Sequence, residues 1–229
     1  MKKSIKEFKD IHKSADIWII GAGASMDFID PSFFEGKITI GLNRVSMKYD
    51  CSYIVSKDSI GFSKVDTKNA KLIISKHNCG DTWQRENSLH GDYWIFEHPD
   101  KPNQEPLLHT IQKNSDKIIV SYSTITSAMH IAAYMGAKNI ILCGHDCGLV
   151  NNNYTFKGYY ENSKEVTALN TTSSQDFKSE YFKFIERMAP HTIQVKEKLL
   201  EVYNTNIYSL NPFTSFQMEG NEVLIPKLP

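Results

Sequence analysis

The chain is organised around the stretch 117-KIIVSYSTITSAMHIAAYMGAKNIILCGHDCG-148, in which apolar runs alternate with polar turns. Lys117–Val120 has the length and composition of a strand, and the hydroxyl-rich turn after it leads into apolar residues at helical spacing up to Met135. Gly136 predicts the end of this helix. Asn139–Cys143 is apolar without alternation, which is typical of a central parallel strand covered on both faces. The stretch therefore predicts a strand–helix–strand unit.

Further apolar runs of strand length repeat this pattern along the chain, and each ends at polar residues. Helical periodicity appears between and after them. We therefore predict one α/β domain over residues 1–229, with a Rossmann-like, mostly parallel sheet flanked by helices. The polar residues before the first run favour a short helix. The predicted strands are Asp16–Ile20, Lys37–Leu42, Ser52–Val55, Lys71–Ser75, Tyr93–Phe96, Lys117–Val120, Asn139–Cys143 and Asn206–Leu210.

Two later segments have a different composition from the strands. Residues 149–175 are polar and aromatic without a clear period, which predicts a lid over a ligand site or a small subdomain. Helical periodicity returns at Asp176. Pro190 predicts a break, with a second helix over 193–202.

The charge balance argues against nucleic acid as a partner. Lys and Arg number 26, Asp and Glu also number 26, and the sequence has no basic stripe. The four cysteines lie mostly in or beside apolar runs, and no secretory signal or long apolar span is evident. We expect a cytoplasmic protein. Peripheral association with the inner face of a membrane and homo-oligomerisation both stay open.

A glycine turn follows the first predicted strand. Gly21, Gly23 and Ser25, in the sequence Gly-Ala-Gly-Ala-Ser, can bring backbone N–H groups up to a phosphate at the start of a helix. The dinucleotide fingerprint is not met, because Met26 stands at the third glycine position and no acidic residue follows the second strand. The turn predicts a nucleotide site that is not an NAD site; the alternative is a glycine turn without a ligand.

Polar side chains also end the second and third predicted strands. Asn43 can hydrogen-bond a base or ribose edge, or it can satisfy its own turn. Ser56 and Asp58 follow the third strand, and Asp58 suits a ribose hydroxyl, a metal-bound water or the cap of the next helix. Ligands of parallel sheets bind beyond the carboxyl ends of the strands, so all three are candidate nucleotide contacts.

The opening stretch holds the other candidates from the residues alone. Thr126 and Ser127 lie at the start of the helix, where they or Thr124 should supply the N-cap, and these hydroxyls also suit a phosphate or carboxylate. Gly144 and Asp146 follow the central strand. Asp146 either holds Mg²⁺ together with phosphates or accepts hydrogen bonds that shape its loop, and we favour the loop-shaping role.

Together, the motif Ile125-Thr126-Ser127, the helix that ends at Gly136 and the motif Gly144-His145-Asp146 resemble the bacterial family 42 sialyltransferases. Tyr154 stands at the position of a family tyrosine that holds the phosphate of the CMP-sugar, and Asn43 resembles an asparagine that contacts the nucleotide. His191 lies near the place of the family's general-base histidine, at an offset position. The same skeleton is similar to the MptE-like 6-hydroxymethylpterin diphosphokinases and the motility accessory factor glycosyltransferases.

The resemblance implies a nucleotide-dependent transferase, foremost a sialyltransferase-like glycosyltransferase that acts on a bacterial surface glycan. It implies a CMP-sugar-like donor, a glycan or small-molecule acceptor, His191 as base, Tyr154 on the leaving phosphate, and no metal or other cofactor.

The second interpretation is an MptE-like diphosphokinase that moves pyrophosphate from ATP to a pterin-type alcohol, with Mg²⁺ at Asp58 and Asp146. The third is a non-catalytic nucleotide- or glycan-binding protein. Three residues depart from the sialyltransferase pattern, namely Ala22, Thr124 and Gly148, where the family has asparagine, arginine and tyrosine, and the missing arginine and tyrosine favour this third interpretation.

Overall fold

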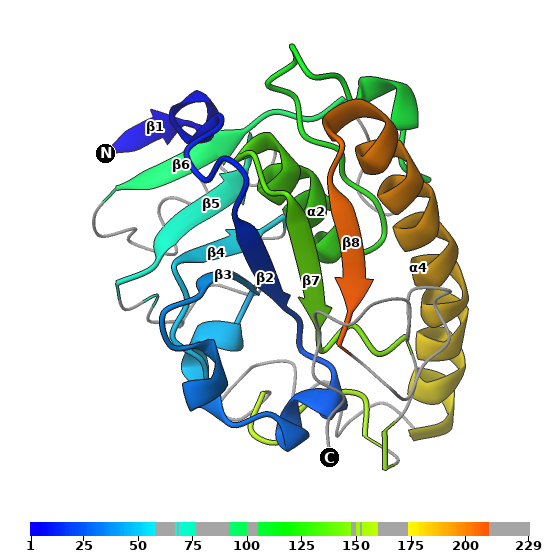
Figure 1. Ribbon diagram of the computed structural model, residues 1–229. Coiled ribbons are helices and arrows are strands. Elements are labelled where there is room, and N and C mark those ends of the chain that lie inside the picture. Colours follow the sequence, from blue (N-terminus) through cyan, green and yellow to red (C-terminus); the bar gives the residue numbers. More distant parts are fainter. Residues whose placement is uncertain are drawn as a thin grey trace.

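The computed structural model describes residues 1–57, 67, 69–76, 92–99, 105–147, 150–151, 153–159 and 174–210, and of 174–186 it describes the helical backbone only. These residues form one eight-stranded sheet in which every pairing is parallel, so the predicted α/β fold is confirmed. The strands are β1 (Lys2–Ser4), β2 (Asp16–Ile20), β3 (Ile38–Leu42), β4 (Tyr53–Ser56), β5 (Lys71–Ser75), β6 (Tyr93–Phe96), β7 (Asn139–Cys143) and β8 (Asn206–Ser209). Their spatial order is β1-β6-β5-β4-β3-β2-β7-β8 (Figure 1).

Both faces of the sheet are buried in its middle, which explains why the central strands are apolar without alternation. In β2, Ile17 and Ile19 point into a core shared with helix α2 (Thr124–Tyr134). Trp18 and Ile20 point to the opposite face. That face is covered by the short 3-10 helices η2 (Ala24–Phe28), η3 (Pro31–Phe34) and η4 (Val45–Met47). Two further 3-10 helices, η1 (Ile5–Phe8) and η7 (Leu108–Thr110), are not part of this cover.

Helix α2 has a defined beginning and end. Its N-cap is Ser123, whose Oγ accepts a hydrogen bond from the Ile125 N–H at 3.4 Å. At the other end Gly136 has a φ of +92°, and the N–H of Ala137 donates to the Ala132 carbonyl at 3.1 Å. This is the glycine-terminated helix end that the sequence predicts.

The strand predicted over Lys117–Val120 is wrong. Lys117 makes one isolated parallel bridge to Glu97, in which the Ile118 N–H donates to Glu97 O at 2.8 Å, and Ile119 then pairs with side chains of α2 instead of a strand. The Ile119 N–H donates to His130 Nδ1 at 3.2 Å, and the Ile119 carbonyl accepts from Ser127 Oγ at 2.8 Å. Because α2 satisfies these buried backbone groups, no further strand is needed to pair them.

The predicted break at Pro190 is also wrong, because α4 runs unbroken over Ser174–Tyr203 (Figure 1). A proline inside a helix removes one hydrogen bond, but Val195 and Leu199 are fully buried against the α2 core and hold the helix in place. The short helix expected before the first predicted strand is the 3-10 helix η1, and strand β1 before it was not predicted. In the described part of the chain, no helix combines the length and the apolar character needed to span a membrane.

Candidate functional site

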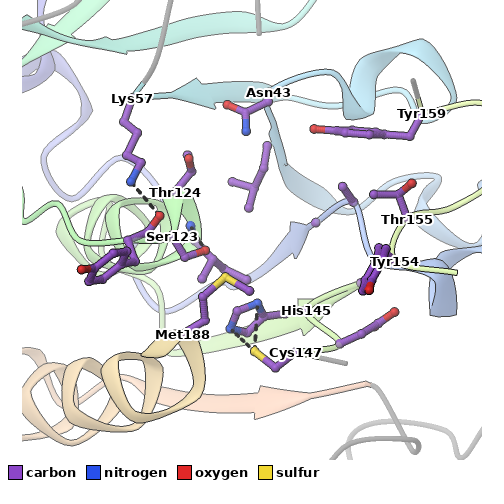
Figure 2. Close-up of a pocket in the computed structure, with 18 residues that line it drawn as sticks. Asn43, Lys57, Ser123, Thr124, His145, Cys147, Tyr154, Thr155, Tyr159 and Met188 are labelled. Carbon is purple, nitrogen blue, oxygen red and sulfur yellow. Dashed lines mark hydrogen bonds between the residues drawn. The ribbon is translucent and has the colours of Figure 1, made fainter. Parts of the chain in front are cut away.

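A pocket of about 260 Å³ lies at the carboxyl ends of β2, β3, β4 and β7 (Figure 2). The beginning of α2, the segment 154–159 and one residue of α4 complete its wall. Half of the predicted site residues line this pocket, at the edge of the sheet expected for a parallel arrangement. Those that line the pocket are Gly21, Gly23, Asn43, Gly144, Asp146 and Tyr154. The others, Ser25, Ser56, Thr126, Ser127 and His191, stand behind the lining, and Asp58 lies outside the described residues.

The glycine turn after β2 crosses the loop after β7 with backbone in contact with backbone. The N–H of Gly21 donates to Cys143 O at 2.7 Å, and the N–H of Gly23 donates to Gly144 O at 2.8 Å. A Cβ at Gly21 would lie 2.5 Å from Gly144 O, so only glycine permits this approach. The expectation that these two N–H groups meet a phosphate is therefore wrong, because both are used within the protein. The turn contributes its exposed surface to the pocket instead.

Asp146 holds the same crossing from the β7 side. Its Oδ2 accepts a hydrogen bond from the Ser25 backbone N–H at 2.8 Å, and its Oδ1 accepts one from Ser25 Oγ at 2.5 Å. Both residues are buried. The carboxylate thereby fixes the start of η2, which is the loop-shaping role that we favoured for it over Mg²⁺ binding.

Asn43 stands at the end of β3 in a left-handed conformation, with φ at +53°. Asparagine tolerates this conformation better than most residues do. Its N–H donates to Val55 O at 3.0 Å, and its Oδ1 accepts from Ser56 Oγ at 3.0 Å. The amide nitrogen points into the pocket (Figure 2). Ser56 thus orients Asn43, and Asn43 presents a hydrogen-bond donor to a ligand.

Lys57 is a pocket residue that the sequence analysis did not identify. It directly follows β4, is 3% exposed, and donates from Nζ to the carbonyl oxygens of Ser121 and, at 2.8 Å, Tyr122. Among the described lining residues it alone is cationic. Its place between Ser56 and Asp58 at a strand end was the available signal.

Thr126 and Ser127, whose hydroxyls were predicted to bind an anion, are the third and fourth residues of α2 and do not line the pocket. Thr126 Oγ1 donates to Ser123 O at 2.9 Å and lies 2.9 Å from Ser121 Oγ, and Ser127 donates to backbone inside the core. Both are fully buried. Ser123 and Thr124 face the pocket instead (Figure 2). The prediction that Thr124, Thr126 or Ser127 caps the helix is likewise wrong, since Ser123 is the N-cap.

His145 forms part of the pocket floor and is tied to α4. Its Nε2 lies 2.8 Å from Thr192 Oγ1, and that hydroxyl donates its proton to Met188 O at 2.9 Å. The hydroxyl proton is thus already used, so the hydrogen-bond network assigns the imidazole proton to Nε2. Burial lowers the pKa of His145 to about 3, and the ring stays neutral at physiological pH.

His191 packs behind the pocket wall. Its ring lies 5.6 Å from the ring of Tyr122, a lining residue, and its buried Nδ1 has no hydrogen-bond partner among the described residues. Burial lowers the pKa of His191 and Arg187 adds to this effect, while Glu105 opposes it. The imidazole is therefore neutral near pH 7.

The described part of the predicted lid is attached to the glycine turn. The Phe156 N–H donates to Ala22 O at 2.9 Å, and the Lys157 N–H donates to Asp27 Oδ2 at 3.0 Å. Tyr154 and Tyr159 line the pocket from this segment (Figure 2). Most of the remaining lid prediction, over 160–173, lies outside the described residues.

Among known proteins, this chain is similar to solved structures only at the level of the fold. The chain matches no protein-family model and no curated protein sequence. A variant of the sialyltransferase CST-II in complex with CMP is 16% identical, with 93% of this chain and 86% of that chain covered and a TM-score of 0.51. Campylobacter jejuni CstII in complex with cytidine-5'-monophosphate is 15% identical, and the match covers 95% of this chain and 86% of that chain with a TM-score of 0.49. The Campylobacter jejuni α-2,3-sialyltransferase Cst-I is 14% identical, and the match covers 94% of this chain and 81% of that chain, also with a TM-score of 0.49. At such identities the first likeness shows the fold alone, and for the fold the predicted resemblance to the sialyltransferases is confirmed.

Proposed function

We propose that this protein is a glycosyltransferase that moves a sialic-acid-like sugar from a CMP-sugar donor to a glycan acceptor. The observation that carries the proposal is the pocket at the carboxyl ends of β2, β3, β4 and β7, where Asn43, the start of α2 and Tyr154 converge. The pocket belongs to a chain whose fold is similar to that of CST-II, and that CST-II structure is a complex with CMP. Bacterial surface glycans are the acceptor class that the sequence resemblance favours, and we place their modification in the cytoplasm at the inner face of the membrane.

We assign a separate role in the proposed reaction to each group of pocket residues. The Asn43 amide would donate to the nucleotide, and the hydroxyls of Ser123 and Thr124 would meet the charged part of the donor. In the reaction, the acceptor oxygen forms a bond to the anomeric carbon while the bond from that carbon to the phosphate oxygen breaks. CMP leaves with the bonding electron pair. Tyr154 and Tyr159 would donate hydrogen bonds to the departing phosphate, so we propose that no metal ion is needed.

A base must take the proton of the acceptor hydroxyl, and two histidines are near. His145 is a poor acceptor, because its pKa is about 3 and its Nε2 proton is committed to Thr192. His191 is neutral near pH 7, and its Nδ1 has no partner among the described groups. We therefore propose His191 as the general base. Since its ring packs against Tyr122, this role requires the Tyr122 side chain to move when the acceptor binds.

Nucleotide binding tests the proposal first. Thermal unfolding of the protein should shift upward with CMP more than with UDP, GDP or ATP, with or without Mg²⁺, because ligands that bind the native state stabilise it. CMP-sialic acid should then be turned over in excess EDTA. Selective stabilisation by ATP with strict Mg²⁺ dependence would overturn the proposal in favour of the diphosphokinase, and CMP binding without any turnover would leave only a binding protein.

Two variants test the assigned residues. Asn43→Gly keeps a residue that accepts the positive φ but removes the amide, so it should weaken CMP binding without loss of the fold. Tyr154→Phe removes one donor to the phosphate and should lower kcat by about a hundredfold to a thousandfold. Tyr93→Phe, on β6 away from the pocket, is the matched control and should leave kcat unchanged.

A further inference from the structure

We infer that a groove beside β1, lined by lysines, binds the phosphate head groups of anionic lipids, and this inference does not depend on the function proposed above. The groove has a volume of about 620 Å³, more than twice that of the pocket at the ends of β2, β3, β4 and β7. Its charged lining residues are Lys2, Lys3, Lys6, Lys76, Lys117, Glu97 and Asp116. Five cations therefore share this groove with two carboxylates, and we call it the lysine groove.

The ion pairs at the lysine groove leave part of its positive charge unbalanced. Lys2 and Lys117 are exposed, and neither has an ion pair with a carboxylate in the part of the chain that the structure describes. Their ammonium groups are thus available to a ligand. The other three lysines pair with nearby carboxylates, as Lys3–Asp92 at 2.6 Å, Lys6–Asp116 at 3.3 Å and Lys76–Glu97 at 2.7 Å.

Two serine hydroxyls add uncharged donors to the lysine groove. Ser4 Oγ accepts a hydrogen bond from the Lys6 N–H at 3.3 Å, and Ser115 Oγ accepts one from the Lys117 N–H at 3.1 Å. Each oxygen is therefore used within the protein, and neither hydroxyl gives its proton to another described group. Hydroxyl and ammonium donors around one hollow are the groups that bind the oxygens of a phosphate.

A lipid suits the lysine groove better than a nucleic acid does. Proteins bind single strands by stacking aromatic side chains on the bases, and no aromatic residue is among the described residues that line the groove. Next to Lys2, Met1 is 82% exposed and adds an apolar side chain beside the cations. Lysines that meet lipid phosphates, together with an apolar group that meets the acyl region, are typical of a peripheral membrane contact.

The lysine groove lies on the same side of the sheet as the pocket. All strands are parallel, so their carboxyl ends share one side, with β1, β6 and β5 beyond β4 and away from β7 and β8 (Figure 1). Ser4 ends β1, Lys76 follows β5 and Glu97 follows β6, and all three line the groove. Lipids bound there would therefore hold the pocket beside the membrane surface.

Co-sedimentation with lipid vesicles tests the inference. The full chain should bind vesicles that contain roughly one third phosphatidylglycerol in phosphatidylcholine, should leave them as salt rises, and should ignore phosphatidylcholine alone. The double variant Lys2→Gln with Lys117→Gln removes the two lysines without ion pairs, so no carboxylate loses a partner. Its binding should fall by about 25-fold, because each lysine near an anionic surface contributes about fivefold.

The matched control is Lys138→Gln with Lys196→Gln, which changes the net charge equally at the turn before β7 and on α4. It should bind the anionic vesicles like the wild type. Equal losses in the two double variants, or no loss in the first, would overturn the inference. A wild-type protein that ignores anionic vesicles, or that prefers a single-stranded oligonucleotide to them, would overturn it too. None of these outcomes bears on the binding of CMP, so the proposed function is judged separately.

Discussion

Replacing Asp146 by asparagine tests whether this carboxylate shapes the site or serves a ligand. The two contacts to Ser25, at 2.8 and 2.5 Å, are hydrogen bonds to a charged group in a buried place. Such bonds contribute about 1.5–3 kcal/mol each, roughly twice as much as neutral ones. Asparagine can still accept from the Ser25 N–H and donate to its Oγ, so about half of each contribution should be lost. The unfolding free energy should fall by about 1.5–3 kcal/mol.

Urea unfolding followed by circular dichroism measures this loss, and the chain supplies its own control. Asp30 accepts from the same two groups of a serine, the N–H and Oγ of Ser32, both at Oδ1 with distances of 2.8 and 2.6 Å, on a turn open to water. Asparagine and aspartate are nearly equivalent at such a cap, so Asp30→Asn should change the urea midpoint little.

Equal shifts of the urea midpoint in the two variants would contradict the loop-shaping role of Asp146. An Asp146→Asn variant that keeps full stability and loses a Mg²⁺-dependent activity would also contradict it, since the carboxylate would then act on a ligand.

Three further perturbations address other parts of the structure. Gly23→Ala would place a Cβ 2.5 Å from the Asp146 carboxylate, so it should lower both the thermal midpoint and CMP affinity, whereas Gly36→Ala, with open space around it, should cost only its backbone strain. Because unfolded histidine takes up a proton near pH 6.5 and folded His145 stays neutral down to about 3, the unfolding free energy should fall as pH drops below about 6.5, and urea titrations should show a shallower fall in His145→Gln. Pro190→Ala should raise the unfolding free energy by about 1–3 kcal/mol if α4 is continuous, and an unchanged value would indicate a break there.

The strands at the centre of the sheet were predictable because burial on both faces makes them apolar along their whole length, and such runs can be recognised in the sequence. A strand such as β7 is covered on both faces, and each of its residues is buried. Strand β1, with the sequence Lys-Lys-Ser, has an exposed pattern and pairs through its backbone at the edge of the sheet. No apolar signal therefore marks it.

The site was predictable where a residue's role depends on its place at a strand end, and less so where it depends on rotation or on distant partners. Asn43 and Tyr154 lie in the pocket as expected. Ser127 lies close to the helix start in sequence, but the helical rotation turns it into the core, where it satisfies a backbone carbonyl. Lys57 takes its role from carbonyls 64 and 65 positions away, and no local motif could indicate them.

The wholly parallel sheet has a consequence for how the chain folds during synthesis. Parallel neighbours cannot be joined by a tight hairpin, and β2 pairs with β7 across 123 positions, from Asp16 to Asn139. Until Cys143 has left the ribosome, β2 has β3 alone beside it, and the apolar face of Ile17 and Ile19 lacks the cover of α2 for nearly as long. Nascent chains that stop before β7 should therefore aggregate or bind chaperones, and chains released after β8 should not.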